Sequence, residues 1–155
     1  MARKTSGLFG VGYEGKTVAT LVDQLVAEGC TTLVDVRLNP VSRKPGFSKR
    51  RLGEALAAAG IEYQHRPELG NPKENRAGFG ATGPAFDVAV RTYATRIAAD
   101  ERARSAIEEL ARAGSRQRVA VLCYESDDAR CHRQVILSAV CDRHTSGKGS
   151  TRPGR

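Results

Sequence analysis

Short continuous apolar runs alternate along the chain with longer segments in which apolar residues recur every three or four positions. The short runs are rich in β-branched residues, which is typical of strands buried on both faces. The longer segments predict amphipathic helices. Strands are therefore predicted at 7–12, 31–37, 61–65 and 118–124, and helices at 17–28, 52–59, 84–98, 101–113 and 129–141.

This order of elements predicts an α/β fold: a mainly parallel sheet with helices on both faces, in the three-layer manner of Rossmann-like and flavodoxin-like proteins. The chain has 155 residues, 40% of them hydrophobic, which suits one domain with one core. We expect this single domain to span residues 1–143. Ligands of such sheets usually bind beyond the carboxyl ends of the strands, so the segments that follow the predicted strands are the candidates for a site.

Two segments interrupt the regular pattern. Residues 66–83 are dense in Gly, Pro, Asn and charged residues and exceed the length of ordinary connections, so we expect a functional loop or mobile lid there. Residues 144–155 contain no apolar residue that a core could bury. We expect them to form a disordered basic tail.

The cysteines and the apolar runs bear on the compartment. No run approaches the roughly 18 apolar residues of a membrane helix, and the first residues do not resemble an export signal. Cys30, Cys123, Cys131 and Cys141 form no closely spaced pair, and the core is large enough to need no disulfide. We therefore expect a cytoplasmic protein with reduced thiols and no membrane contact.

The chain is strongly basic, with a formal net charge of +8 and a pI near 9.7. Lys and Arg gather in the loop 43–51 and in the tail, and Phe47 lies within that loop. Cations beside an aromatic ring suit phosphate contact and base stacking. The alternative is a solvated loop in which Phe47 packs as an anchor. A nucleic-acid-binding or regulatory module that uses this loop and the tail is thus a second hypothesis for function.

Gly10, Gly12 and Gly15 follow the first predicted strand with the spacing of a dinucleotide-binding loop, and Asp35 lies downstream at a suitable distance for a ribose. Tyr13 and Glu14 fill the intervening positions, however, where they place a bulky phenol and an anion in the path of a pyrophosphate. The pattern therefore favours a tight structural turn, in which glycine adopts conformations that other residues avoid.

Asp35 and Arg37 end the second predicted strand two residues apart, so both lie on the same face. One interpretation is an internal ion pair. In the other, the fork-shaped guanidinium of Arg37 binds a phosphate or carboxylate while Asp35 orients it or acts as a base. The position at the carboxyl edge of the sheet favours the second interpretation.

The densest polar cluster runs from Cys123 to Arg133. Cys131, at the expected start of a helix beside His132 and Arg133, suits a nucleophile whose thiolate is stabilised by the dipole and the cations. Cys123 followed by Arg130 is similar to the thiolate-plus-arginine loop of phosphatases and sulfurtransferases, but the acids between them would repel an anion. Both cysteines are also compatible with simple burial.

A metal site is a further alternative at this cluster. Cys123, Glu125, Cys131 and His132 offer four ligand types. Adjacent residues of a helix point in different directions, so Cys131 and His132 are expected to diverge, and no familiar zinc spacing appears. The sequence therefore assigns no metal, and it identifies neither a cofactor nor an oligomeric state.

Several ordered motifs resemble the family called domain of unknown function 488, over nearly all of residues 8–142. They are Gly10-Val11-Gly12-Tyr13-Glu14-Gly15, Leu33-Val34-Asp35-Val36-Arg37 with Asn39-Pro40, Pro45-Gly46-Phe47-Ser48, Pro67-Glu68-Leu69-Gly70, and Cys123-Tyr124-Glu125 with Cys131-His132-Arg133. The resemblance implies an α/β fold and no particular reaction. Tyr124 stands where the family suggests a small residue, and we expect it to narrow the pocket.

The leading hypothesis is an enzyme, or an enzyme-derived domain, that acts on a small anionic or nucleotide-like substrate by hydrolysis or group transfer. The expected catalytic residues are Glu14, Glu125, Cys131 and His132, with the carboxylates or the imidazole as general acid or base. The expected substrate-binding residues are Tyr13, Asp35, Arg37, Ser48 and Arg133.

Overall fold

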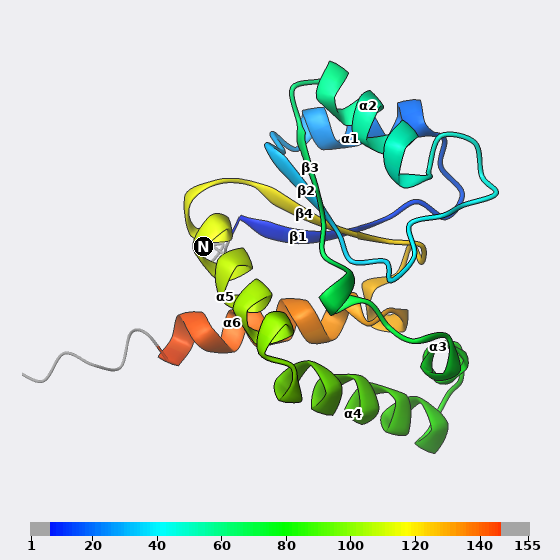
Figure 1. Cartoon of the computed structure of the whole chain (residues 1–155), viewed down its shortest axis with the longest axis vertical. Coiled ribbons are helices and arrows are strands. Elements are labelled where there is room, and N and C mark those ends of the chain that lie inside the picture. Colours follow the sequence, from blue (N-terminus) through cyan, green and yellow to red (C-terminus); the bar gives the residue numbers. More distant parts are fainter. Residues whose placement is uncertain (1–6, 147–155) are drawn as a thin grey trace, which may run out of the picture.

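A four-stranded parallel sheet lies at the centre of the computed structural model, which describes residues 7–146 (Figure 1). Its strands are β1 (Leu8–Gly12), β2 (Thr32–Asp35), β3 (Glu62–His65) and β4 (Val119–Cys123). They pair side by side in the order β1-β4-β2-β3, and every pairing is parallel. The predicted parallel sheet is confirmed, and each observed strand lies within a predicted one.

Helices occupy the connections between the strands and follow the last of them. The α-helices of the described residues are α1 (Val18–Ala27), α2 (Lys49–Ala58), α3 (Lys73–Phe79), α4 (Pro84–Ala99), α5 (Glu101–Arg116) and α6 (Arg133–Ser146). Two short 3-10 turns are η1 (Pro67–Leu69) and η2 (Asp128–Arg130). The α1 and α5 helices begin where Thr17 and Asp100 accept backbone N–H groups that the helix leaves unpaired.

The helices cover both faces of the sheet, as the sequence predicts. In Figure 1, α1 and α2 lie on one face, and α4, α5 and α6 lie on the other. The side chains of β4 alternate between the two layers: Ala120 and Leu122 pack in the core with α1 and α2, whereas Val119, Val121 and Cys123 pack in the core with α4, α5 and α6. Because successive residues of a strand point to opposite faces, the position of a polar residue along the chain determines on which face of the sheet it lies.

The register brings three strand ends to one edge of the sheet. Gly12 of β1 lies beside Cys123 of β4, and Leu122 of β4 lies beside Asp35 of β2. The segments that follow these strands are therefore neighbours in space although they are distant in sequence. As expected for parallel α/β sheets, the polar residues gather at this edge.

Two sequence expectations about local structure are wrong. Residues 66–83 contain η1 and the helix α3, and Leu69 and Phe79 from this stretch are buried in the core, so it is not an irregular loop; a functional role of the stretch stays a prediction. The last helix begins at Arg133 instead of Ala129, because Asp127 caps the short turn η2 and Cys131 then adopts an extended backbone. The chain remains helical to Ser146, and the rest of the expected tail, 147–155, lies outside the described residues.

None of the helices within residues 7–146 combines the length and the apolar character that crossing a membrane requires.

Candidate functional site

Two groups of polar residues lie at the carboxyl edge, on opposite faces of the sheet. The first, here called the arginine network, lies on the side of α1 and α2 and consists of Tyr13, Asp35, Arg37, Phe47 and Tyr63. The second, here called the cysteine pocket, lies on the side of α3 to α6 and is lined by Asn71, Arg76, Phe79, Cys123, Glu125, Cys131 and His132.

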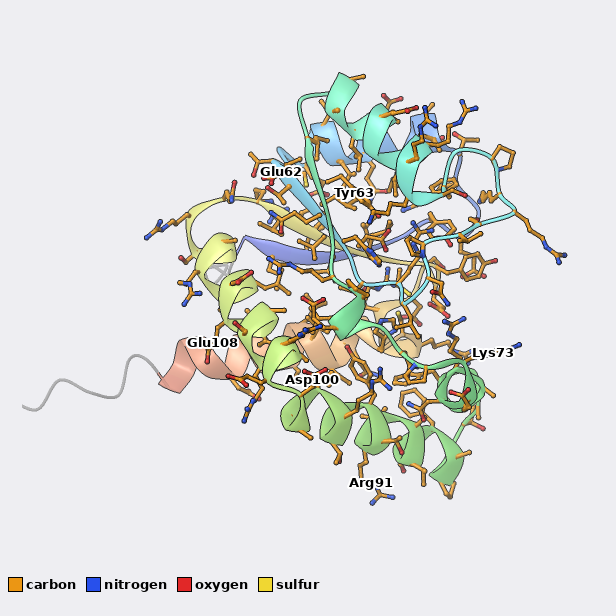
Figure 2. All side chains as sticks on the ribbon, viewed as in Figure 1. Glu62, Tyr63, Lys73, Arg91, Asp100 and Glu108 are labelled. Atoms are coloured by element: carbon orange, nitrogen blue, oxygen red, sulfur yellow. The ribbon has the colours of Figure 1, made fainter. Side chains whose placement is uncertain are left out.

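Arg37 is the centre of the arginine network and has partners on all of its guanidinium nitrogens. Its Nε donates to Asp35 Oδ1 at 2.9 Å and its Nη2 to Asp35 Oδ2 at 2.7 Å. Its Nη1 donates to the carbonyl of Phe47 at 2.7 Å and lies 3.3 Å from the hydroxyl of Tyr13. The hydroxyl of Tyr63, which projects from β3 toward α2 (Figure 2), donates to Asp35 at 2.6 Å. Arg37 and Asp35 therefore form the internal ion pair that the sequence left open.

The contacts within the arginine network stabilise the charged form of Arg37 and the neutral form of Tyr63. Burial alone would lower the pKa of Arg37, but the hydrogen bonds and the charge of Asp35 outweigh it and raise that pKa. Burial raises the pKa of Tyr63, and its hydrogen bond to Asp35 raises it further. A buried pair of this kind is costly to break, because removal of one partner leaves an uncompensated charge. Ligand binding by Arg37 stays a prediction, since a ligand would have to replace one of these contacts.

The sequence also marks Tyr13 and Ser48 for substrate binding; Tyr13 belongs to this network, and Ser48 directly follows Phe47 of it. The ring of Tyr13 is buried and stacks on Phe47 with 4.5 Å between the centroids. Phe47 is fully buried, so it anchors the basic loop and does not offer a stacking face to a base. Ser48 precedes α2, and its hydroxyl accepts from the backbone of Ser42 at 3.3 Å. These residues shape the loop 38–48 and do not line the cysteine pocket.

The turn after β1 packs against the loop between β4 and η2. Exposed Glu14 accepts from the backbone N–H of Ser126 at 3.1 Å, away from the cysteine pocket. A Cβ at Gly12 would lie 1.8 Å from the carbonyl oxygen of Glu125, so only glycine permits this approach. Tyr124 is 48% exposed and meets the edge of Tyr13, so it lines no part of the cysteine pocket.

Arg133 also stabilises the loop between β4 and η2. It is fully buried, and its guanidinium donates to the backbone carbonyls of Val11 and Glu125. Its Nε lies 3.0 Å from Asp128 Oδ1 in an ion pair. Asp128 therefore compensates the cation that the sequence places in the first turn of a helix. Substrate binding by Arg133 stays a prediction, whereas its contacts with the loop are direct.

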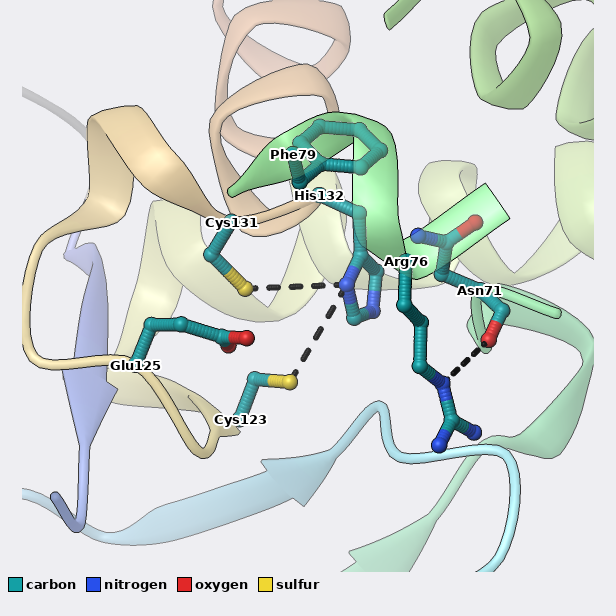
Figure 3. Close-up of a pocket in the computed structure, with 7 residues that line it drawn as sticks. All are labelled: Asn71, Arg76, Phe79, Cys123, Glu125, Cys131 and His132. Carbon is teal, nitrogen blue, oxygen red and sulfur yellow. Dashed lines mark hydrogen bonds between the residues drawn. The ribbon is translucent and has the colours of Figure 1, made fainter. Parts of the chain in front are cut away.

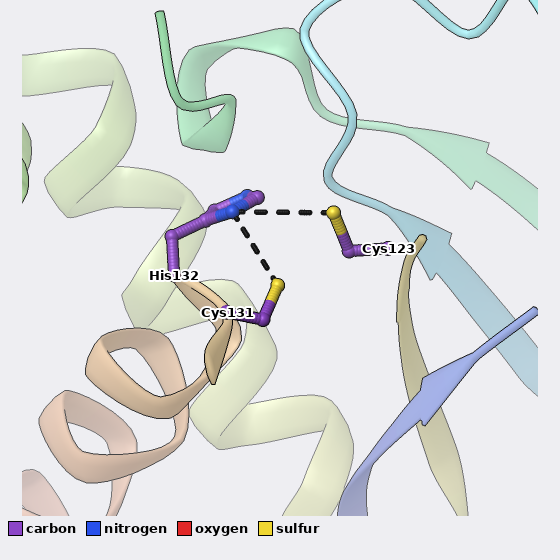
Figure 4. A group of neighbouring side chains, drawn as sticks. All are labelled: Cys123, Cys131 and His132. Carbon is purple, nitrogen blue, oxygen red and sulfur yellow. Dashed lines mark hydrogen bonds between the residues drawn. The ribbon is translucent and has the colours of Figure 1, made fainter. Parts of the chain in front are cut away.

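The cysteine pocket brings two thiols and an imidazole together (Figure 4). The Nδ1 atom of His132 lies 3.6 Å from the sulfur of Cys131 and 3.9 Å from the sulfur of Cys123. These three atoms all lie within 4.8 Å of one another, and all three residues are buried. The expected divergence of Cys131 and His132 is wrong, because both precede α6 and are not part of its regular turns.

The imidazole of His132 is held in one orientation and one tautomer. Its Nε2 lies 3.1 Å from the carbonyl oxygen of Val36, and a carbonyl can only accept, so Nε2 carries a proton. The ring also packs edge-on against buried Tyr93 at 5.1 Å. In the neutral ring, Nδ1 therefore presents a lone pair to the two sulfurs.

The two thiols have unlike acidities. A hydrogen bond from the thiol of Cys131 holds the pKa of Cys123 well below its ordinary value in spite of burial, and the charged form of His132 acts in the same direction. The pKa of Cys131 is raised, because its proton is shared with Cys123 and because it is buried. Cys123 is thus the sulfur that ionises first, in an otherwise apolar layer of the core.

Residues from two other segments complete the pocket, whose volume is about 40 Å³ (Figure 3). Figure 3 shows the carboxylate of Glu125 pointing toward the two sulfurs, and its Oε2 is buried without a hydrogen-bond partner among the described residues. Arg76 of α3 donates through Nε to the carbonyl of Asn71 at 3.1 Å. Within the described part of the chain, Nη1 and Nη2 of Arg76 have no protein partner.

Asn71, Arg76 and Phe79 are site residues that the sequence analysis did not identify individually. They lie in the stretch 66–83, which the sequence marks as functional but does not resolve into elements. The available signal was the spacing of Asn75 and Phe79 on one helical face, where Asn75 donates to the carbonyl of Ala89 and Phe79 is buried.

Comparison with known proteins bears on the family of the chain. Residues 17–140 match a family model described as Domain of unknown function DUF488. No curated protein and no solved structure matches the chain. The match covers most of the chain. It includes every residue of the arginine network and of the cysteine pocket except Tyr13, which precedes residue 17.

Proposed function

We propose that this chain, which belongs to the DUF488 family, is an enzyme that binds a small anion, or the anionic end of a larger molecule, in the cysteine pocket and transfers a group from it to water. One observation carries the proposal. Two charged side chains with unused hydrogen-bonding capacity, Arg76 and Glu125, meet at a pocket that also contains the ionisable pair of Cys123 and His132.

The free face of Arg76 supports the binding of an anion. A guanidinium presents donors in a fork that fits carboxylate or phosphate oxygens. The arginines at the other positions marked by the sequence, Arg37 and Arg133, already have protein partners. Arg76 is therefore the residue that we expect to bind the substrate.

The carboxylate of Glu125 supports a role as general base. Its buried oxygen without a partner is a position for an attacking water, and proton transfer to a positioned carboxylate typically contributes about 10²–10⁴-fold to a rate. The volume of about 40 Å³ admits a few waters and a reacting group, so the body of a nucleotide would remain outside. The thiols must be reduced for this arrangement, as expected of a cytoplasmic protein.

Thermal unfolding with inorganic phosphate and with sulfate tests the binding step. An anion at about 100 times its Kd raises the free energy of unfolding by about 2.7 kcal/mol. We expect this stabilisation in the wild type and its loss in Arg76→Gln. The matched control is Arg91→Gln on α4, which removes the same charge from an exposed residue that does not line the pocket and whose side chain points away from the sheet in Figure 2. Equal stabilisation of both variants, or none in the wild type, would contradict the proposal.

The chemical step is tested with a panel of small anionic esters. We expect Glu125→Gln to lower kcat by about 10²-fold or more while phosphate still stabilises the variant. Glu14→Gln is the control, because Glu14 binds the backbone of Ser126 outside the pocket. Equal loss in both variants would assign the effect to the loop and not to a base.

A second candidate, nucleic-acid binding, rests on the first turn of α2. Lys49, Arg50 and Arg51 are all exposed there, the turn contains no acid, and Ser48 makes no capping hydrogen bond. Cations at a helix N-terminus are unfavourable unless an anion approaches. Retention on nucleic acid that falls steeply with salt, in a variant that lacks 147–155, supports this function, and retention that vanishes with those residues contradicts it.

A further inference from the structure

We propose that Cys123, Cys131 and His132 bind a thiophilic divalent metal ion, of which Zn²⁺ fits best, with the fourth position occupied by a water that Glu125 contacts. The metal site stands on the geometry of the three ligands alone. Its role as the source of the attacking water deepens the proposed function and rests on it.

The distances between the candidate ligand atoms agree with a tetrahedral site. With Zn–S near 2.3 Å and Zn–N near 2.05 Å, tetrahedral angles place a sulfur and a nitrogen about 3.6 Å apart. The structure has 3.6 Å from His132 Nδ1 to the sulfur of Cys131 and 3.9 Å to the sulfur of Cys123. All three atoms lie within 4.8 Å of one another. Both sulfur–nitrogen distances thus lie within about 0.3 Å of the tetrahedral value.

The surroundings of His132 are those of a metal ligand. Histidines that bind metals commonly donate their second ring N–H to a carbonyl or carboxylate, which fixes the tautomer and strengthens the ligand. Nε2 of His132 does this to the carbonyl of Val36, and Tyr93 packs on the ring. The free nitrogen is consequently Nδ1, which faces both sulfurs.

The ligand set and the charge balance select the metal. Two thiolates and one imidazole suit Zn²⁺ better than the hard cations Mg²⁺ and Ca²⁺, which prefer oxygen ligands. Two thiolates neutralise the charge of Zn²⁺, so the complex can be buried without a net charge. Three protein ligands and an open position are typical of catalytic zinc sites, in which the bound water becomes acidic near neutral pH.

A metal also satisfies groups that a disulfide would leave without partners. A bond between Cys123 and Cys131 would leave Nδ1 of His132 and Oε2 of Glu125 buried and unpaired, which is unfavourable for each group. With metal bound, Nδ1 coordinates the ion and Glu125 accepts a hydrogen bond from the bound water.

In the reaction, a proton of the bound water passes to Glu125 while the water oxygen bonds to the substrate. The leaving group departs with the electrons of the broken bond and takes the proton from Glu125.

Titration of the reduced, chelator-treated full chain with Co²⁺ tests the site directly. We expect one Co²⁺ per chain, with the sulfur-to-cobalt charge-transfer band and the intense d–d bands of tetrahedral coordination, and displacement of the cobalt by Zn²⁺. Cys131→Ser and His132→Gln should weaken Zn²⁺ binding by more than about 100-fold, beyond the effect of losing an outer-shell partner. The matched controls Cys30→Ser and Cys141→Ser remove the thiols outside the cluster and should leave the spectrum unchanged.

Each outcome of this experiment either supports or overturns the metal site. Circular dichroism establishes that each variant is folded. A folded wild type without the charge-transfer band, or a band that survives in both Cys131→Ser and His132→Gln, overturns the metal site. A band that Glu125→Gln abolishes overturns the assignment of the fourth position to water. The phosphate experiment with Arg76→Gln is independent of Co²⁺, so the failure of the metal site and the failure of the proposed function are distinguishable.

Discussion

The arginine network and the cysteine pocket occupy the same edge of the sheet, yet they differ in how completely their polar atoms are satisfied. In the arginine network, every nitrogen of the Arg37 guanidinium has a protein partner and Asp35 accepts from three donor groups. In the cysteine pocket, Glu125 and Arg76 retain unused capacity beside two thiols. Location at a strand end therefore does not distinguish the two regions, whereas the unused hydrogen-bonding capacity of Glu125 and Arg76 does.

The largest effect that the comparison predicts is on the stability of the arginine network. Arg37→Ala leaves Asp35 charged and buried, and we expect the free energy of unfolding to fall by about 3–5 kcal/mol in urea denaturation. Arg50→Ala breaks the exposed ion pair with Glu54 and serves as the control, with a loss below about 1 kcal/mol. A loss of similar size in both variants would mean that the network is not a structural unit.

Gly12 of β1 packs against the backbone of Glu125, a residue of the cysteine pocket. A Cβ in Gly12→Ala meets the carbonyl of Glu125, so we expect a loss of about 1–3 kcal/mol together with weaker phosphate stabilisation of the pocket. Gly53→Ala in α2 is the control, because its Cβ makes only ordinary contacts with Tyr63, and alanine is the better helix former. Unchanged phosphate stabilisation in Gly12→Ala would show that the pocket does not depend on this approach.

A smaller and pH-dependent effect is expected at Tyr63. Tyr63→Phe removes one hydrogen bond to Asp35, with a loss of about 1.5 kcal/mol near neutral pH. Because the folded state raises the pKa of Tyr63, its contribution is complete below pH 10, the ordinary pKa of tyrosine, and declines as pH rises above it. Unfolding measured on both sides of that pH should show a shallower alkaline decline in Tyr63→Phe than in the wild type.

The smallest effect on stability is expected at Arg76, where the effect on binding is the largest. Arg76 is exposed and has one hydrogen bond to Asn71, so Arg76→Ala should change the free energy of unfolding by no more than about 0.5 kcal/mol. Phosphate should no longer stabilise this variant. A destabilisation above about 1.5 kcal/mol would place Arg76 among the structural residues and remove the contrast between the two regions.

The sequence predicted the elements better than their ends or their order. Continuous apolar runs and helical spacing located all four strands and the helices α1, α2, α4 and α5, because burial on one or two faces leaves a clear period. The α3 helix was missed because only Phe79 of it is buried and its neighbours are polar or small. The pattern of apolar residues does not indicate that β4 lies between β1 and β2, since each of these strands is apolar.

The candidate site was predicted in position but not in detail. Glu125, Cys131 and His132 were selected because they follow a predicted strand, at the edge where ligands of parallel sheets usually bind, and all three line the cysteine pocket. The partners that distinguish the two regions come from distant segments: Phe47 and Tyr63 complete the arginine network, and Arg76 completes the cysteine pocket. Such partners follow from tertiary packing, which local spacing does not encode. The same limit explains why the convergence of Cys131 and His132 was not expected.

The position of β4 also has a consequence for how the protein acquires its site during synthesis. The ribosome delivers β1, β2 and β3 first, but β1 can pair only with β4, whose first residue is Val119. Until then the nascent chain can form the β2–β3 pair while the edges of β1 and β2 stay open, and such edges are prone to wrong pairing. The last strand also carries Cys123, so the step that closes the sheet is the step that assembles the cysteine pocket. A partly synthesised chain therefore holds neither the finished sheet nor the site.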